Sequence, residues 1–101
     1  MIKVDIKAKN NLVNSITISG HSNYSESGKD IVCSAVSSIA ITTVNAILKI
    51  NEHSIKYEDK DGYLKINVLL HNDTINTLID NMIELLEELQ EQYKKYVKIN
   101  R

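Results

Sequence analysis

The spacing of hydrophobic residues switches twice along this chain from a period of two to a period of about 3.6, and this pattern most constrains the fold. Ile2, Val4 and Ile6 alternate with polar residues, which predicts a strand with one buried face. A second strand is expected from Leu12 to Ser19. Asn10-Asn11 predicts the turn between them, because Asn tolerates a left-handed backbone. The first 19 residues therefore predict a hairpin.

A helix is expected next, from about Ile31 to Leu48, where apolar residues recur at helical spacing. Asp30 stands directly before this run, at the position of an N-cap. The nine residues 21–29 before the cap are mostly small and polar, which predicts a mobile loop. This half of the chain therefore indicates two strands, a loop and a capped helix.

The second half of the chain repeats the pattern. Strands are expected from Ile55 to Glu58 and from Tyr63 to Leu70. Asp61-Gly62 between them predicts a type I′ turn, which needs positive φ at both central residues. Asn72-Asp73 offers a second N-cap, and the apolar stripe that follows predicts a long helix from about Thr74 to Tyr96.

The ββαββα order predicts an α+β fold in two layers, with a four-stranded, mainly antiparallel sheet and both helices on one face. A chain of 101 residues has room for one domain, which we expect to span residues 1–101. The other face of the sheet, or the flank of a helix, could support a dimer.

Charge and composition narrow the classes of partner and compartment. Twelve basic and 13 acidic residues give a net charge of -1, which argues against direct binding to nucleic acid. The sequence predicts neither a signal peptide nor a run of about 20 apolar residues that would span a membrane. One cysteine allows no internal disulfide, so a reducing cytoplasm is expected.

The stretch from Gly20 to Ser38 carries the residues best suited to chemistry. It holds the single cysteine, Cys33, and one of three histidines, His21. If Asp30 is the cap, Cys33 lies in the first helical turn, where the helix dipole favours a thiolate and backbone N–H groups could bind an oxyanion. His21 could exchange a proton with it across the loop. The alternative is a cysteine that packs in the core and a histidine that is merely exposed.

Other residues near this pair have two interpretations each. Asp30 either caps the helix or orients His21. Ser37, one turn after Cys33, either lines a pocket or bonds back to a helix carbonyl. Tyr24 either stacks on a substrate or covers the edge of the core. The three histidines and Cys33 lack the tight spacing of a structural zinc site, so neither a metal nor a cofactor is expected.

The stretch GHSNYSESGKDIVCSAVSS resembles the GHA…G-x-DIVC-x-A-V-S signature of the ribosomal-processing cysteine protease family Prp. The family's ββαββα order resembles the predicted order along nearly the whole chain. The resemblance implies a catalytic histidine at His21 and a nucleophilic cysteine at Cys33. It also implies supporting roles for the residues that match the family's glycine, aspartate and serine, namely Gly20, Asp30 and Ser37.

The resemblance further implies a small homodimeric bacterial cysteine peptidase. Its substrate would be the N-terminal extension of a large-subunit ribosomal protein, the twenty-seventh of the series, cut after a hydrophobic segment. The sequence departs from the family pattern at Ser22 and Ser34, where the family usually has alanine. A rival interpretation is a non-enzymatic, ribosome-associated binding module in which Cys33 is structural. A redox-sensing thiol is a third, although no resolving cysteine lies in the chain.

Overall fold

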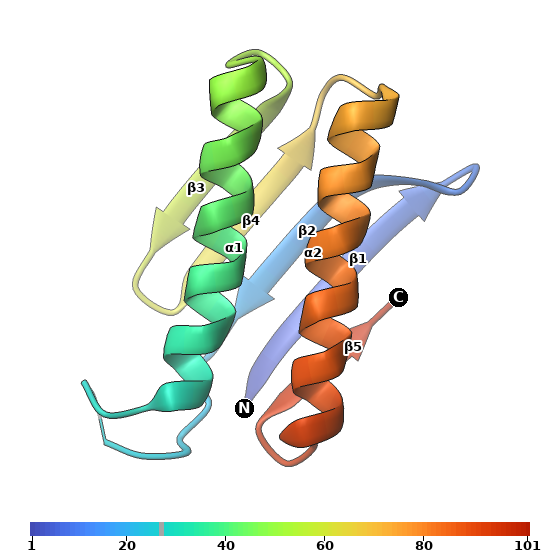
Figure 1. The fold of residues 1–101 in the computed structure, drawn as a ribbon. Helices are drawn as coiled ribbons and strands as arrows, with labels where there is room; N and C mark the ends of the chain where they lie inside the picture. Colours follow the sequence, from blue (N-terminus) through green and yellow to red (C-terminus); the bar gives the residue numbers. More distant parts are fainter. Residues whose placement is uncertain (27) are drawn as a thin grey trace.

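The computed structural model describes residues 1–26 and 28–101; Ser27, part of the expected loop 21–29, lies outside the described residues. A five-stranded sheet in the order β3-β4-β2-β1-β5 forms one layer. Two helices, α1 (Ile31–Ile50) and α2 (Asp73–Gln92), lie side by side across one face of it (Figure 1). The α+β class and the two-layer arrangement are therefore as predicted.

The first hairpin forms as the sequence predicts. β1 (Ile2–Lys9) pairs antiparallel with β2 (Leu12–Ser19), and Asn10-Asn11 connects them. Asn10 has a φ of 54° and Asn11 a φ of 64°, so both turn residues adopt the left-handed backbone that a two-residue I′ turn requires. Isoleucines and valines of both strands face the helices and are buried.

The second hairpin pairs β3 (Ile55–Lys60) with β4 (Tyr63–Val68). β3 ends two residues later than predicted, and β4 ends two residues earlier. β4 stops at Val68 because the N–H groups of Leu69 and Leu70 turn to the carbonyl oxygen of Ser54, at 2.8 and 3.1 Å. The turn is not type I′. Gly62 has a φ of 68°, but Asp61 is not among the described residues with positive φ.

α1 begins and ends close to the predicted residues. Asp30 is its N-cap and accepts a hydrogen bond from the Cys33 N–H, as predicted. The helix runs two residues beyond Leu48, to Ile50. It buries one face, to which Val32, Val36, Ala40, Val44 and Ile47 belong.

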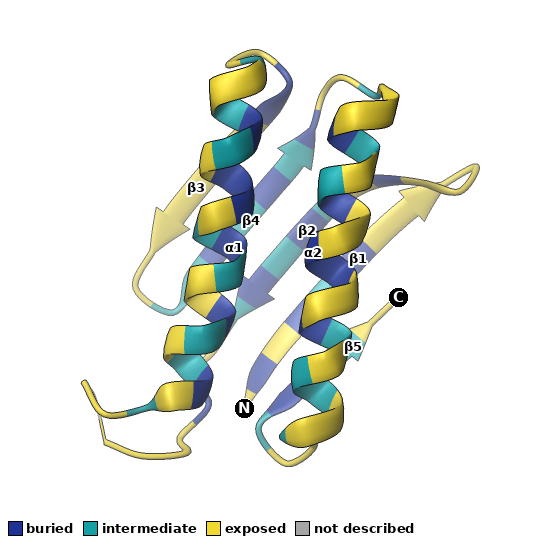
Figure 2. Ribbon diagram, in the orientation of Figure 1, coloured by how far each residue is buried: buried dark blue, intermediate teal, exposed yellow. Residues whose placement is uncertain are grey.

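The expectation that no segment resembles a membrane span is wrong for α1. Its 20 residues are long and apolar enough by length and composition, and about a third of that segment is buried in this fold. A helix that packs on the core of a domain meets the same two criteria, and α1 packs its buried face against the sheet (Figure 2).

The end of α2 and the number of strands differ from the prediction. Asn72 caps α2 as expected, but the helix ends at Gln92 rather than near Tyr96. The chain then forms a fifth strand, β5 (Val97–Asn100), which pairs parallel with β1. The N–H of Ile2 donates to the Tyr96 carbonyl oxygen at 2.8 Å at the start of this ladder. The sheet is therefore five-stranded and mixed, not four-stranded.

Candidate active site

His21 and Cys33 come together at one end of the sheet. β2 ends at Ser19, so His21 follows two residues after a strand, and Cys33 is the third residue of α1. Both residues line a cavity of about 530 Å³ between the first half of α1 and the β3–β4 hairpin. The apolar part of the wall comes from Ile2, Ile18, Val36, Ala40, Ile41 and Leu64, and charged residues of the hairpin line the other part.

A second, smaller cavity of about 300 Å³ lies beside the first. Its lining is polar and includes Asn23, Ser25 and Asp30. Only His21, Cys33 and Asp61 line both cavities among the residues that the structure describes. The thiol and the imidazole therefore lie where the two cavities meet.

The backbone around His21 is fixed by close packing. Gly20, at a φ of 90°, has no room for a Cβ, which would meet the carbonyl oxygen of Met1. Its N–H donates to the Gly62 carbonyl oxygen at 2.9 Å. The amino group of Met1 donates to the His21 carbonyl oxygen at 2.6 Å. Backbone packing therefore requires glycine at position 20.

The His21 ring lies against the β3–β4 turn. A Cβ built on Gly62 would lie 2.8 Å from Nε2 of His21, 3.2 Å from Cε1 and 3.5 Å from Cδ2. This is closer than real Cβ atoms approach, so the ring occupies space that only glycine leaves open. The sequence signalled Gly62 as a turn residue but gave no sign of this contact, because the two residues are far apart in the chain.

Asp30 acts as a helix cap, and its carboxylate does not bond the His21 ring. Oδ1 accepts from the Cys33 N–H at 2.9 Å. Oδ2 accepts from the Ser22 hydroxyl and from the Tyr24 N–H, the latter at 3.2 Å. Burial opposes ionisation, but the hydrogen bonds from Ser22 and from the N–H groups of Cys33, Ser25 and Tyr24 outweigh it and hold the pKa of Asp30 below its ordinary value.

Ser22 is a structural residue that the sequence did not reveal. It is buried, with 2% of its surface exposed, and its hydroxyl both donates to Asp30 and accepts from the Tyr24 N–H at 3.3 Å. Ser22 is one of the two departures from the family signature. At this position the hydroxyl ties the loop to the helix cap.

The two backbone N–H groups nearest to the thiol in the chain already donate hydrogen bonds to Asp30. The Cys33 N–H donates to the Asp30 side chain, and the Ser34 N–H donates to the Asp30 carbonyl oxygen at 3.1 Å. Neither group is available to an oxyanion in this arrangement. Cys33 itself is half-buried and is not in a disulfide.

Ser37 and Tyr24 each follow one of their two interpretations. Ser37 is exposed and lines the larger cavity together with Cys33. Tyr24 packs edge-to-face on Tyr93 and Tyr96, with ring centroids 5.7 and 5.1 Å apart. It thereby covers the connection between α2 and β5 and ties the loop to it.

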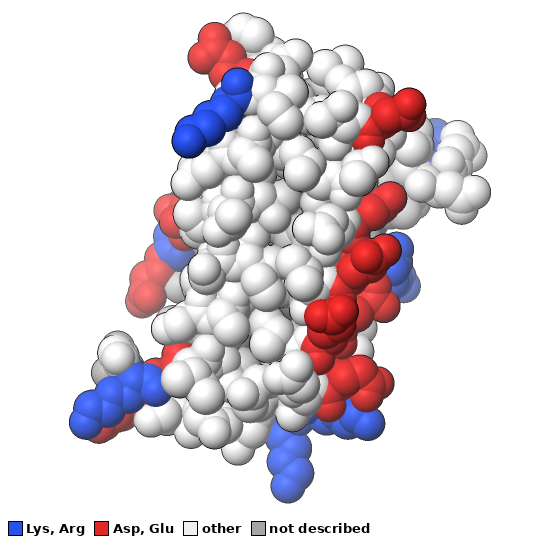
Figure 3. All heavy atoms as spheres, in the orientation of Figure 1, with Lys and Arg blue, Asp and Glu red and all other residues white. Residues whose placement is uncertain are grey.

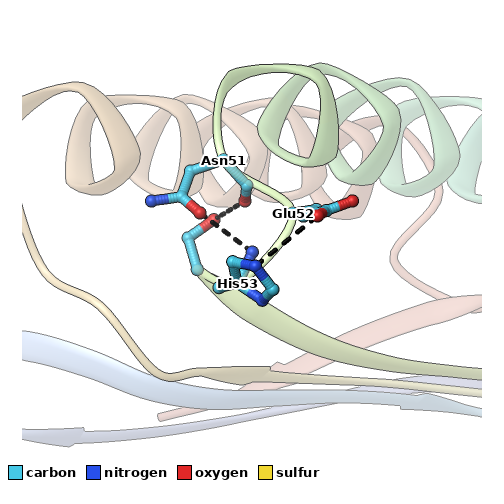
Figure 4. Close-up of polar contacts among 4 residues, drawn as sticks. Asn51, Glu52 and His53 are labelled. Atoms are coloured by element: carbon cyan, nitrogen blue, oxygen red, sulfur yellow. Dashed lines mark hydrogen bonds and ion pairs between the residues drawn. The ribbon is translucent and has the colours of Figure 1, made fainter.

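The other two histidines lie away from this site. His53 follows α1 at the end opposite Cys33, where its N–H donates to Asn51 Oδ1 at 2.9 Å and its ring faces Glu52 (Figure 4). The His71 ring contacts Asn76 Oδ1 at 3.0 Å, beside the start of α2. Across the described ranges 1–26 and 28–101, no group of three or more potential ligands is placed to hold a metal ion.

Comparison with known proteins agrees with the resemblance seen in the motif. The family described as Cysteine protease Prp matches residues 1–98. The chain belongs to this family. A ribosomal processing cysteine protease Prp of Staphylococcus aureus is 31% identical, over 99% of this chain and 98% of the relative.

Solved structures show the same fold. The S. aureus protease in complex with a covalently linked product peptide has a TM-score of 0.94 and 28% identity, covering 99% of this chain and 98% of that one. Its complex with a substrate peptide has a TM-score of 0.87 and 27% identity at the same coverage. The family, and the fold with its two helices on a five-stranded sheet, are therefore established.

Proposed function

We propose that this chain is a cysteine endopeptidase in which Cys33 is the nucleophile and His21 is the general base and acid. The observation that carries the proposal is that these two side chains line the same two adjoining cavities in a member of a cysteine protease family. A thiol and an imidazole at the junction of two grooves match what amide hydrolysis through an acyl-enzyme requires.

The reaction proceeds in two steps. His21 takes the thiol proton, the Cys33 sulfur attacks the scissile carbonyl carbon, and the C–N bond breaks as His21 returns the proton to the leaving amine. Water, deprotonated by His21, then hydrolyses the thioester and releases the second product. We assign Ser37, which lines the larger cavity together with Cys33, to contact with the bound peptide.

The substrate we propose is a short hydrophobic N-terminal extension of a large-subunit ribosomal protein, the twenty-seventh of the series. The apolar part of the larger cavity, between Val36, Ala40 and Leu64, suits the hydrophobic residues of such a segment. The related S. aureus protease has been solved with a substrate peptide and with a covalently linked product peptide. We also propose a homodimer in the cytoplasm, with no cofactor.

The experiment is cleavage of a synthetic peptide that spans the extension and its junction with the ribosomal protein. We expect the wild type to cut once, and Cys33→Ala and His21→Ala each to lose at least about 100-fold in kcat/KM. Ser38→Ala is the matched control, since Ser38 is exposed on α1 and lines neither cavity. Wild-type rates in either alanine variant would contradict the mechanism.

Thiol reactivity separates the proposal from a binding module. A catalytic Cys33 is expected to react with iodoacetamide at pH 7 faster than free cysteine, and His21→Ala should slow that reaction. Alkylation no faster than that of free cysteine, with no cleavage of the peptide, would favour the non-enzymatic module instead.

A further inference from the structure

The mechanism above leaves one chemically active residue at the site without a role. Asp61 is the third residue that lines both cavities, together with His21 and Cys33. It lies in the β3–β4 turn, directly before the glycine on which the His21 ring rests. A carboxylate thus stands at the same junction as the thiol and the imidazole.

The orientation of the His21 ring relative to this turn is specific. Nε2 and its two neighbouring carbons, Cε1 and Cδ2, are the atoms nearest to the position that a Cβ of Gly62 would take. The Nε2 edge therefore faces the turn, and Nδ1 lies on the opposite side of the ring. Nδ1 is then the ring nitrogen that the turn leaves free to act as the base.

The other charged groups around His21 are engaged or lie elsewhere. Both oxygens of Asp30 accept hydrogen bonds at the helix cap. Asp59 accepts from the Tyr57 hydroxyl at 3.0 Å, and the Met1 ammonium donates to the His21 carbonyl oxygen. Lys60 lines only the larger cavity. Within residues 1–26 and 28–101, the Asp61 carboxylate makes none of the hydrogen bonds or ion pairs of this fold.

We propose that Asp61 is the positioning residue of His21: its exposed carboxylate, which does not bond the ring in this structure, rotates in solution to accept a hydrogen bond from Nε2–H and so leaves Nδ1 unprotonated. Fixing the tautomer of a histidine through the nitrogen that does not react is a common way to prepare it as a base. The inference rests on the proposed function, since it assigns a partner to the proposed general base.

The first test needs no activity. Nitrogen-15 NMR of the three histidines at pH 8 reports which ring nitrogen of each carries the proton, with His53 and His71 as internal references. We expect His21 to be protonated at Nε2 in the wild type and to become a mixture of tautomers in Asp61→Ala. Glu58→Gln removes one negative charge from an exposed position of the same hairpin that lines neither cavity, and should leave the tautomer unchanged.

Kinetics on the extension peptide provide the second test. Asp61→Ala and Asp61→Asn should lower kcat about tenfold with KM changed less than about twofold, and Asp61→Glu should recover part of the loss. A loss expressed mainly in KM would assign Asp61 to peptide binding and overturn the proposal. Tautomers identical in Asp61→Ala and the wild type would also overturn it.

The two proposals fail in different ways. If the wild type cleaves no peptide and Cys33 is unreactive, the proposed function fails whatever the tautomer of His21. If the wild type cleaves and both Asp61→Ala and Asp61→Asn cleave with unchanged kcat, the proposed function stands and the role of Asp61 is wrong.

Discussion

Gly62 leaves the space that the His21 ring occupies, so its backbone position affects a residue of the proposed catalytic pair. Ala at this position adds a Cβ that would lie 2.8 Å from Nε2 of His21. Because His21 is an exposed side chain, its ring is expected to swing away at small cost to stability while losing its place beside Cys33. We expect Gly62→Ala to lower kcat/KM at least about tenfold.

Gly28→Ala is the matched control for this change. Gly28 also has a positive φ, 85°, and lines the smaller cavity, but a Cβ there meets nothing within 4 Å and so leaves His21 in place. Both variants therefore strain the backbone by about 1 kcal/mol, and only Gly62→Ala displaces the imidazole. Similar urea midpoints with different activities would support the contact. Equal activity in the two variants would contradict it.

Asp30 gives stability a pH dependence whose sign follows from its hydrogen bonds. In the folded chain the pKa of Asp30 lies below the ordinary value of 3.8. The ionised carboxylate is therefore stabilised in the folded state relative to the unfolded state. This contribution is complete above pH 3.8 and is lost as the pH falls through the lower, folded-state pKa. Wild-type stability should therefore fall in acid more steeply than that of Asp30→Asn.

Urea denaturation of both chains between about pH 6 and pH 2 measures this difference. Asn still caps the helix well, so the two chains compare the charge rather than the cap. The difference in unfolding free energy between the wild type and Asp30→Asn should become smaller below about pH 4. Parallel pH profiles would show that the ionised carboxylate contributes nothing.

The elements that the sequence predicts well are those with strong local signals. The turn at Asn10-Asn11 and the helix caps at Asp30 and Asn72 depend on the backbone and side chains of neighbouring residues. They can therefore be predicted without knowing any contact between distant residues. β5 has only four residues, and its pairing with β1 depends on the chain returning to Ile2. The apolar spacing of α2 continues through Tyr93 and Tyr96, so periodicity alone does not predict that the helix ends at Gln92.

The same division applies to the site. His21 and Cys33 are joined by a short loop, so their meeting could be expected from a strand end and a helix start. Ser22 and Gly62 could not, because their roles depend on hydrogen bonds and contacts that tertiary structure alone creates.

The fifth strand is expected to stabilise the fold rather than merely end the chain. Val97 is fully buried, and it sits opposite Ile2 in the parallel ladder. Val97→Ala should lower the unfolding free energy by about 2 kcal/mol, as loss of a buried branched side chain does. Lys98→Ala, at the next and exposed position, should change it by less than about 0.5 kcal/mol. Equal effects in urea denaturation would show that β5 frays.

At the scale of the whole molecule, charge is unevenly distributed over the helical face. Figure 3 shows acidic side chains along the outer edge of α2 and an uncharged surface over α1 and the seam between the helices. Lys49 is the one charged residue of α1, and its other exposed residues are Ile31 and Ile50 at the helix ends and serine, threonine and asparagine between them. The outer face of α1 is therefore uncharged along most of its length.

We place the interface of the proposed homodimer on this uncharged outer face of α1. Ser38, Thr42 and Asn45 follow one another along this face, are exposed and line neither cavity. A Thr42→Glu, Asn45→Glu double variant places two like charges on each copy at the contact. We expect the wild type to sediment as a dimer at micromolar concentration and the double variant as a folded monomer.

Asn81→Glu is the control for this experiment, because it adds a charge to the exposed acidic side of α2, one turn before Glu84. It should remain dimeric. A double variant that stays dimeric while keeping its circular dichroism spectrum would place the interface elsewhere, and a monomeric wild type would remove the homodimer itself. If the double variant is monomeric yet cleaves at the wild-type rate, each chain holds a complete site.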